Sequence, residues 1–106
     1  MAFYELRRYE IRPGKMDEWL EMMENEIIPM QTARGMVIAG SFRVEGEDAY
    51  VWIRRFENEA ERERLYEAVY KSDLWLEKLT DRVGACINRD TIQVTRIEPT
   101  SRSILQ

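Results

Sequence analysis

The sequence predicts an α+β domain in which helices pack on one face of a four-stranded antiparallel sheet. One observation is the order of hydrophobic periodicities, which runs β-α-β-β-α-β along the 106 residues. The other is residues 50–70, YVWIRRFENEAERERLYEAVY, which pass from a strand pattern to a helix pattern within two residues. That strand has apolar side chains on both faces, Val51 and Ile53 on one and Tyr50 and Trp52 on the other. Such a strand predicts a sheet that is covered on both sides.

The first half of the chain contains a strand, a helix and a second strand. Residues 3–11 alternate in residue type and end at Pro13-Gly14, a turn signal. An amphipathic helix is expected to follow, because apolar residues recur at helical spacing at Met16, Trp19, Leu20, Met23 and Ile27. Pro29 is expected to kink or stop this helix. Residues 36–44 form the second expected strand, in which Gly40 marks either a bulge or a close approach of another backbone.

The second half repeats the pattern in the order strand, helix, strand. Gly46-Glu47-Asp48 is a hairpin-type connection to a strand over residues 50–56. Asn58 stands at a helix N-cap position, with Glu61 three residues later. A second helical segment begins after Ser72-Asp73, with Gly84 as its expected C-cap, and residues 90–98 form the last strand. The resulting βαββαβ order is the ferredoxin-like arrangement.

The alternation of the strands divides their side chains between two faces, and this division predicts a partner. The face expected to meet the helices holds Leu6, Val51, Ile53, Ile92 and Val94. The opposite face is expected to hold Arg7, Tyr9, Tyr50, Trp52, Arg54, Gln93 and Thr95. Because so aromatic a face is rarely left bare, we expect two copies of the chain to pair sheet against sheet as a homodimer.

Size and charge predict a single soluble domain over residues 1–106 and argue against several classes of partner. A net charge of −4 disfavours nucleic acid, whose binding relies on basic residues. No apolar run approaches the roughly 20 residues that cross a bilayer, so no membrane partner is expected. The N-terminus does not resemble a signal sequence, and a single cysteine excludes an intrachain disulfide. We therefore expect a cytoplasmic protein.

The chain contains no histidine, and this absence restricts its chemistry. It removes Ser-His-Asp and Cys-His nucleophilic catalysis and the usual ligands of haem and transition metals. Cys86 lies among small and apolar residues, which indicates a packed side chain. The 20 carboxylates show no calcium-loop spacing. Neither a metal nor another cofactor is therefore expected.

Four segments resemble the NIPSNAP family, which belongs to the dimeric α/β-barrel superfamily. They are YELRRY followed by RPG, VWIRRF-x-x-E-x-ER, SD-x-W and the closing EPTSRSIL. The resemblance implies a homodimer in which two sheets face each other to form a barrel. Superfamily relatives include cofactor-free monooxygenases of polycyclic aromatic substrates, haem-degrading enzymes and small-molecule-binding proteins. The motif positions that match are Arg7, Tyr9, Trp52, Arg54, Phe56 and Trp75.

Three functions remain open from the sequence. The first is binding of a small anionic or aromatic molecule in a cavity of the barrel, the second is a cofactor-independent monooxygenase or isomerase, and the third is a non-catalytic scaffold. No catalytic residue is assigned, so whether the protein is an enzyme stays undecided. The candidate ligand-binding residues are Arg7, Tyr9, Tyr50, Trp52 and Arg54. For Arg54 the alternatives are an anion site and a cross-strand ion pair with Glu5 or Glu10. Trp52 and Tyr9 have the alternative of packing alone.

Overall fold

The computed structural model describes residues 2–106 and has the expected βαββαβ order. The strands are β1 (Phe3–Glu10), β2 (Val37–Arg43), β3 (Ala49–Phe56) and β4 (Gln93–Ile97). The helical segments are α1 (Met16–Met22), η1 (Met23–Ile27), α2 (Ile28–Ala33), α3 (Glu59–Tyr70), η2 (Leu74–Leu79), α4 (Thr80–Cys86) and η3 (Arg89–Thr91). All strand pairs are antiparallel and the spatial order is β2-β3-β1-β4. The ferredoxin-like fold class is thereby confirmed.

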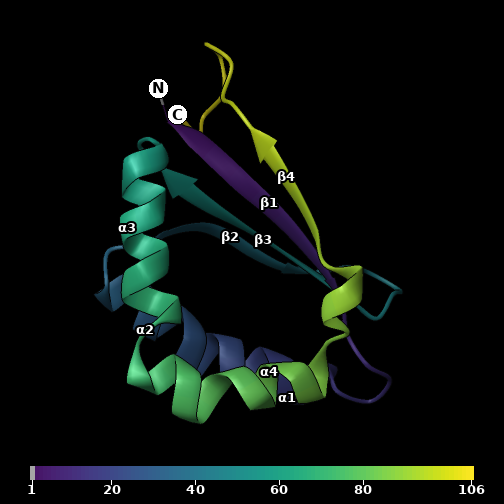
Figure 1. The fold of residues 1–106 in the computed structure, drawn as a ribbon. Helices are drawn as coiled ribbons and strands as arrows, with labels where there is room; N and C mark the ends of the chain where they lie inside the picture. Colours follow the sequence, from purple (N-terminus) through teal and green to yellow (C-terminus); the bar gives the residue numbers. More distant parts are fainter. Residues whose placement is uncertain (1) are drawn as a thin grey trace.

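The helices form one layer against one face of the sheet (Figure 1). Helices α1, α2 and α4 lie together below the sheet, and α3 runs from the strand end of β3 down to them. The other face, called here the open face, meets none of the helices in residues 2–106 (Figure 1). The C-terminal segment covers part of it, where the Tyr4 hydroxyl and Arg55 Nε both donate to the carbonyl oxygen of Gln106, at 3.0 and 2.5 Å. Within residues 2–106, no helix has the length and apolar character needed to cross a membrane.

The sheet faces are reversed in β1 and β3 relative to the sequence-based expectation. Arg7, Tyr9, Tyr50, Trp52 and Arg54 lie on the helix-covered face, where the last four are at most 6% exposed. The residues expected to meet the helices, Leu6, Val51 and Ile53, lie instead on the open face. Expectation and structure agree in β4, since Gln93 and Thr95 pair with the open-face residues of β1 and Ile92 packs against the core.

Side-chain size explains the reversal. Strand periodicity says which residues share a face but not which face the helices cover. Phe3, Tyr9, Tyr50, Trp52 and Phe56 are large rings, each able to bury about 150–250 Å². The space between the sheet and the helical layer is larger than the aliphatic side chains would fill, and the aromatic rings fill it. Arg54 shares their register and is therefore buried with them.

The first helical segment continues past Pro29 instead of ending there. Residues 23–27 form a π-helical turn, and Pro29 lies in the first turn of α2, where a proline leaves no helical hydrogen bond unmade. A second π-helical turn, η2, precedes α4. Gly84 lies inside α4, which ends at Cys86, so the expected C-cap at Gly84 is wrong.

Two local predictions from the sequence are confirmed. The Asn58 side chain accepts a hydrogen bond from the Glu61 backbone N–H at 2.8 Å and caps α3. Glu61 in turn accepts from the backbone N–H of Glu57, one residue before the cap. The β2–β3 pairing shifts register between Ile38 and Gly40, which is the bulge expected at Gly40.

A cavity between the sheet and the helices as candidate site

A cavity of about 210 Å³ lies between the sheet and the helical layer. The sheet contributes three of its lining residues, Arg7, Tyr9 and Trp52. The helices contribute Trp19, Met23, Ile27, Gln31, Tyr66, Tyr70, Trp75 and Val83, and the segment leading into β4 contributes Ile87, Arg89 and Ile92. The cavity is thus largely aromatic and aliphatic, with two arginines in its wall. A concave, mostly apolar site with few polar groups is the usual form of a small-molecule site.

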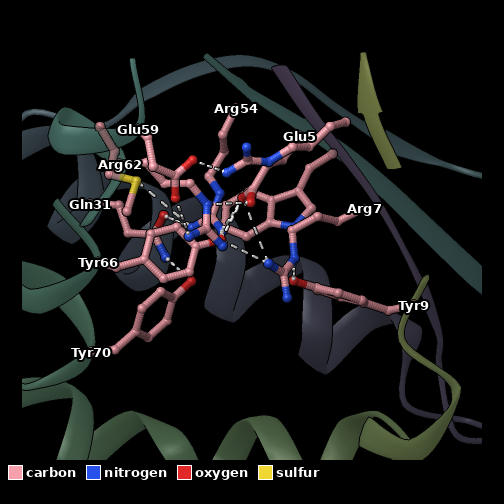
Figure 2. Close-up of polar contacts among 12 residues, drawn as sticks. Glu5, Arg7, Tyr9, Gln31, Arg54, Glu59, Arg62, Tyr66 and Tyr70 are labelled. Atoms are coloured by element: carbon pink, nitrogen blue, oxygen red, sulfur yellow. Dashed lines mark hydrogen bonds and ion pairs between the residues drawn. The ribbon is translucent and has the colours of Figure 1, made fainter. Parts of the chain in front are cut away.

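Arg7 projects its guanidinium into this region from the middle of β1. Its Nε donates to the Tyr9 hydroxyl at 2.9 Å, and its Nη1 donates to the Tyr66 hydroxyl at 3.0 Å. Figure 2 shows the guanidinium on the helix side of the sheet, between the Tyr9 hydroxyl and the Glu5–Tyr66 group. Arg7 keeps 16% of its side chain exposed, whereas Arg54 on the next strand keeps none. Between Arg7 and Arg54, it is therefore Arg7 that borders the cavity.

Behind Arg7 lies a buried polar cluster centred on Glu5, whose carboxylate is 1% exposed. Glu5 lies 3.3 Å from Arg54 Nη2 and 2.7 Å from Arg62 Nε, and it accepts a hydrogen bond from the Tyr66 hydroxyl. Arg7 Nη1 approaches the same carboxylate at 3.8 Å. Three guanidinium groups therefore surround one buried carboxylate, and the cluster carries an excess of positive charge (Figure 2).

Arg54 is held within the protein through both terminal nitrogens of its guanidinium, while its buried Nε has no hydrogen-bond partner among the described residues. Besides Glu5, it donates to the hydroxyls of Tyr66 and Tyr70 at 2.7 and 2.8 Å and to Gln31 Oε1 at 3.0 Å. Its guanidinium carbon lies 4.6 Å from the centre of the Trp52 ring, which adds a cation–π contact. Of the two alternatives left open by the sequence, the ion pair with Glu5 is present.

Ionisation of the cluster follows from burial and from these contacts. Burial raises the pKa of Glu5, but hydrogen bonds from Tyr66 and Arg62 and the charge of Arg54 outweigh it, so the net pKa lies below the ordinary 4.5. Burial also raises the pKa of Tyr9, and it raises that of Tyr66 to about 12 despite the charge of Arg54. Near neutral pH the carboxylate is therefore ionised and both phenols keep their protons.

The structure brings three of the five sequence-predicted residues, Arg7, Tyr9 and Trp52, into the cavity wall. Arg54 lies one layer behind them, in contact with Trp52 and Tyr70. Tyr50 packs edge-on against Trp19, with ring centres 5.6 Å apart, and hydrogen bonds to Ser41 at 2.5 Å. Its burial raises its pKa to about 12. Tyr50 and Arg54 thus support the wall without forming its surface.

Sequence reasoning missed the helical half of the cavity. Tyr66 and Tyr70 are four residues apart in α3 and face the same side, where their rings pack at 5.2 Å. Their spacing was visible in the sequence, but it also fits simple core packing. The sequence did not show that the side chain of Arg54 on β3 points toward this helix. Gln31 and Arg89 carried no periodic signal.

The cavity wall is rich in hydrogen-bond donors and in aromatic surface. Among the lining residues that the structure describes there is no carboxylate and no thiol, and burial raises the pKa of the Tyr9 and Tyr66 phenols. Within residues 2–106, no group of three or more His, Cys, Asp or Glu side chains is placed to hold a metal ion. The wall offers cationic and hydroxyl donors set in aromatic surface.

Fold and cavity together define a ferredoxin-like α+β domain with a ligand-sized space between its layers. The sequence matches the model of the NIPSNAP family over residues 4–102. The chain therefore belongs to the NIPSNAP family.

Related proteins agree with this assignment. Protein NipSnap homolog 3B of mouse is 28% identical over 103 residues, which make up 92% of this chain and 40% of the mouse protein. The chain thus spans less than half the length of that relative. A NIPSNAP family protein from Agrobacterium tumefaciens has the same fold, with a TM-score of 0.89, 22% identity and full coverage of both chains. A NIPSNAP-like domain protein from Burkholderia xenovorans has a TM-score of 0.84 at 22% identity, with coverage of 96% of this chain and 88% of its own.

Proposed function

We propose that this NIPSNAP chain binds a small molecule in the cavity between its sheet and its helices. The observation that carries the proposal is a cavity of about 210 Å³ that remains between layers whose other side chains pack closely. An apolar cavity of about 150 Å³ accommodates benzene, so this one has room for a single substituted ring. The absence of a suitable base in the described wall favours binding over the enzymatic alternative.

Binding can be tested by NMR with a set of single-ring fragments, both charged and neutral, that includes toluene. At least one fragment should shift the methyl signals of Ile27 and Ile87, which line the cavity. The variant Ile92→Trp places a large ring at the half-buried edge of the cavity and should abolish these shifts. Thr95→Trp, on the open face of β4 opposite Leu6, is the matched control and should leave binding intact. No shift with any fragment, or equal binding by Ile92→Trp, would contradict the proposal.

We propose a homodimer as the partner, but on a different surface from the one expected from the sequence. The aromatic residues first assigned to the interface are covered by the helices. The open face carries Leu6, Val51 and Ile53 in its middle, and its margins hold Val37, Phe42 and Ile97, which are 48%, 54% and 38% exposed. A cluster of apolar side chains on a sheet face without helices favours pairing with a second copy.

Light scattering tests the dimer. The expected mass at micromolar concentration is twice the 12.7 kDa of the chain. Ile53→Glu places a carboxylate in the centre of the open face and should yield monomers. Arg64→Glu introduces the same residue on the exposed surface of α3, where the side chain is 69% exposed, and should leave the mass unchanged. A mass of 12.7 kDa for the unaltered chain at every concentration would remove the proposal.

A further inference from the structure

The hydrogen-bond donors in the cavity wall outnumber the acceptors available to them. Arg7 uses Nε and Nη1 in bonds to Tyr9 and Tyr66, but no group within residues 2–106 accepts from its Nη2. A guanidinium has five N–H donors and no acceptor, so the hydrogens on Nη2 remain free for a partner in the cavity. Because Arg7 is largely buried, bulk water meets this need only in part.

The Tyr9 hydroxyl has the same surplus. Its oxygen accepts from Arg7 Nε at 2.9 Å and from Trp52 Nε1 at 3.0 Å, which occupies its acceptor positions. Its own proton has no acceptor among the described residues. Burial raises the pKa of Tyr9, so the proton stays on the oxygen at neutral pH and is available to donate.

Tyr70 repeats the arrangement on the helical side of the cavity. Its hydroxyl oxygen accepts from Arg54 Nη1 at 2.8 Å and from Gln31 Nε2 at 3.4 Å. No group in the described part of the chain accepts its proton. Tyr66 differs, because its hydroxyl accepts from two arginines and donates a hydrogen bond to the Glu5 carboxylate. Arg7, Tyr9 and Tyr70 thus have hydrogens without acceptors, and so does the buried indole Nε1 of Trp19, which also lines the cavity.

Charge points in the same direction as hydrogen bonding. Arg7, Arg54 and Arg62 share the carboxylate of Glu5, and Arg62 alone has a second carboxylate, Glu59 at 3.5 Å. A second arginine, Arg89, also lines the cavity, and the described lining contains no acidic residue. A negative charge near Arg7 would balance this excess, whereas a cation there would be repelled.

From these contacts we infer that the ligand of the cavity is a single-ring aromatic carboxylate whose oxygens accept from Arg7 Nη2 and from the Tyr9 hydroxyl. The ring lies among Trp52, Tyr70 and Trp75, and the volume of the cavity limits it to one ring with small substituents. This inference rests on the proposed function, because it names the class of molecule that the same cavity holds.

The test compares two molecules of one shape and different charge, 4-methylbenzoate and its neutral amide 4-methylbenzamide, with toluene as an apolar probe. Affinities come from titrations that follow the methyl signals of Ile27 and Ile87. The unaltered protein should bind the benzoate at least about tenfold more tightly than the amide, as expected for charge-assisted hydrogen bonds. This comparison needs no variant, so it holds even where a substitution disturbs folding.

Variants then assign the interaction to its residues. Arg7→Met should lower benzoate affinity at least about tenfold and change amide affinity by less than about threefold. Tyr9→Phe should produce a smaller loss for the benzoate, and Arg7→Lys should restore part of the affinity. Arg8→Met is the matched control, because Arg8 is the next residue of β1 and lies on the open face, where it pairs with Glu47. It should leave both affinities unchanged.

The possible outcomes distinguish the anionic class of the ligand from the proposed function, which is binding of a small molecule in the cavity. If toluene or the amide binds as tightly as the benzoate, the cavity is a binding site but the anionic class is wrong. If Arg7→Met leaves benzoate affinity intact, the assignment to Arg7 is wrong. If none of the three molecules moves the cavity methyl signals, the proposed function fails, and the inference fails with it.

Discussion

Two neighbouring arginines of β3 differ in burial because they lie on opposite faces of the sheet. Arg54 is fully buried under the helices, with its guanidinium held by Glu5 and by tyrosine hydroxyls. Arg55, the next residue, lies on the open face, where it bonds to Glu57 and to the C-terminal carbonyl and stays partly exposed. The comparison shows that residue type does not decide which arginine is buried. What decides is the strand register, which places Arg54 with the rings that the helices cover. Glu5 and the tyrosine hydroxyls on that face then compensate the buried charge.

The largest expected difference between the faces concerns these two arginines. Arg54→Met should lower the free energy of unfolding by roughly 3–5 kcal/mol, because it leaves a buried carboxylate without one of its cations. Arg55→Met should lower it far less, since the ion pair with Glu57 is solvated. Urea denaturation of both variants measures the contrast. Equal losses would show that burial of the pair contributes nothing specific.

A smaller contrast compares one substitution on the two faces. Tyr66→Phe removes a hydroxyl that bonds to Glu5, Arg54 and Arg7, and we expect a loss of about 1–3 kcal/mol of unfolding free energy. Tyr4→Phe, on the open face, removes a single bond to the Gln106 carbonyl and should cost about 0.5–1.5 kcal/mol. Thermal and urea unfolding report both. A larger loss for Tyr4→Phe would contradict the importance assigned to the cluster.

The third expected difference is in pH dependence. The pKa of Glu5 is lowered in the folded protein, so its contribution is present above the ordinary value of 4.5 and is lost as pH falls through the folded value. The unaltered protein should therefore lose more unfolding free energy on acidification than Glu5→Gln does. Glu26→Gln is the control, because the lowered pKa of Glu26 comes from Arg82 on an exposed surface, where solvent weakens the pair. If Glu5→Gln and Glu26→Gln lose the same amount of unfolding free energy as the pH falls, Glu5 is not the group whose protonation is coupled to folding.

The sequence predicted the fold well because the fold depends on local signals. Strand alternation, the Asn58 cap and the bulge at Gly40 each act within a few residues. Assigning the faces failed because alternation is symmetric, and choosing the covered face requires the packing of rings against helices. Arg7, which borders the cavity, was among the predicted residues, but the anion site was predicted at Arg54. Only the three-dimensional contacts show that Arg54 is engaged by Glu5 and that Arg7 is left with free donors.

We propose different roles for the two faces of the sheet: a ligand cavity lies under the helices, and the open face binds a second copy of the chain. Isoleucine methyl NMR reports both, since Ile27, Ile87 and Ile92 line the cavity while Ile53 and Ile97 lie on the open face. Addition of 4-methylbenzoate should move the first group, and dilution should move the second. Shifts of Ile53 and Ile97 on ligand addition, with Ile27, Ile87 and Ile92 unmoved, would contradict the account.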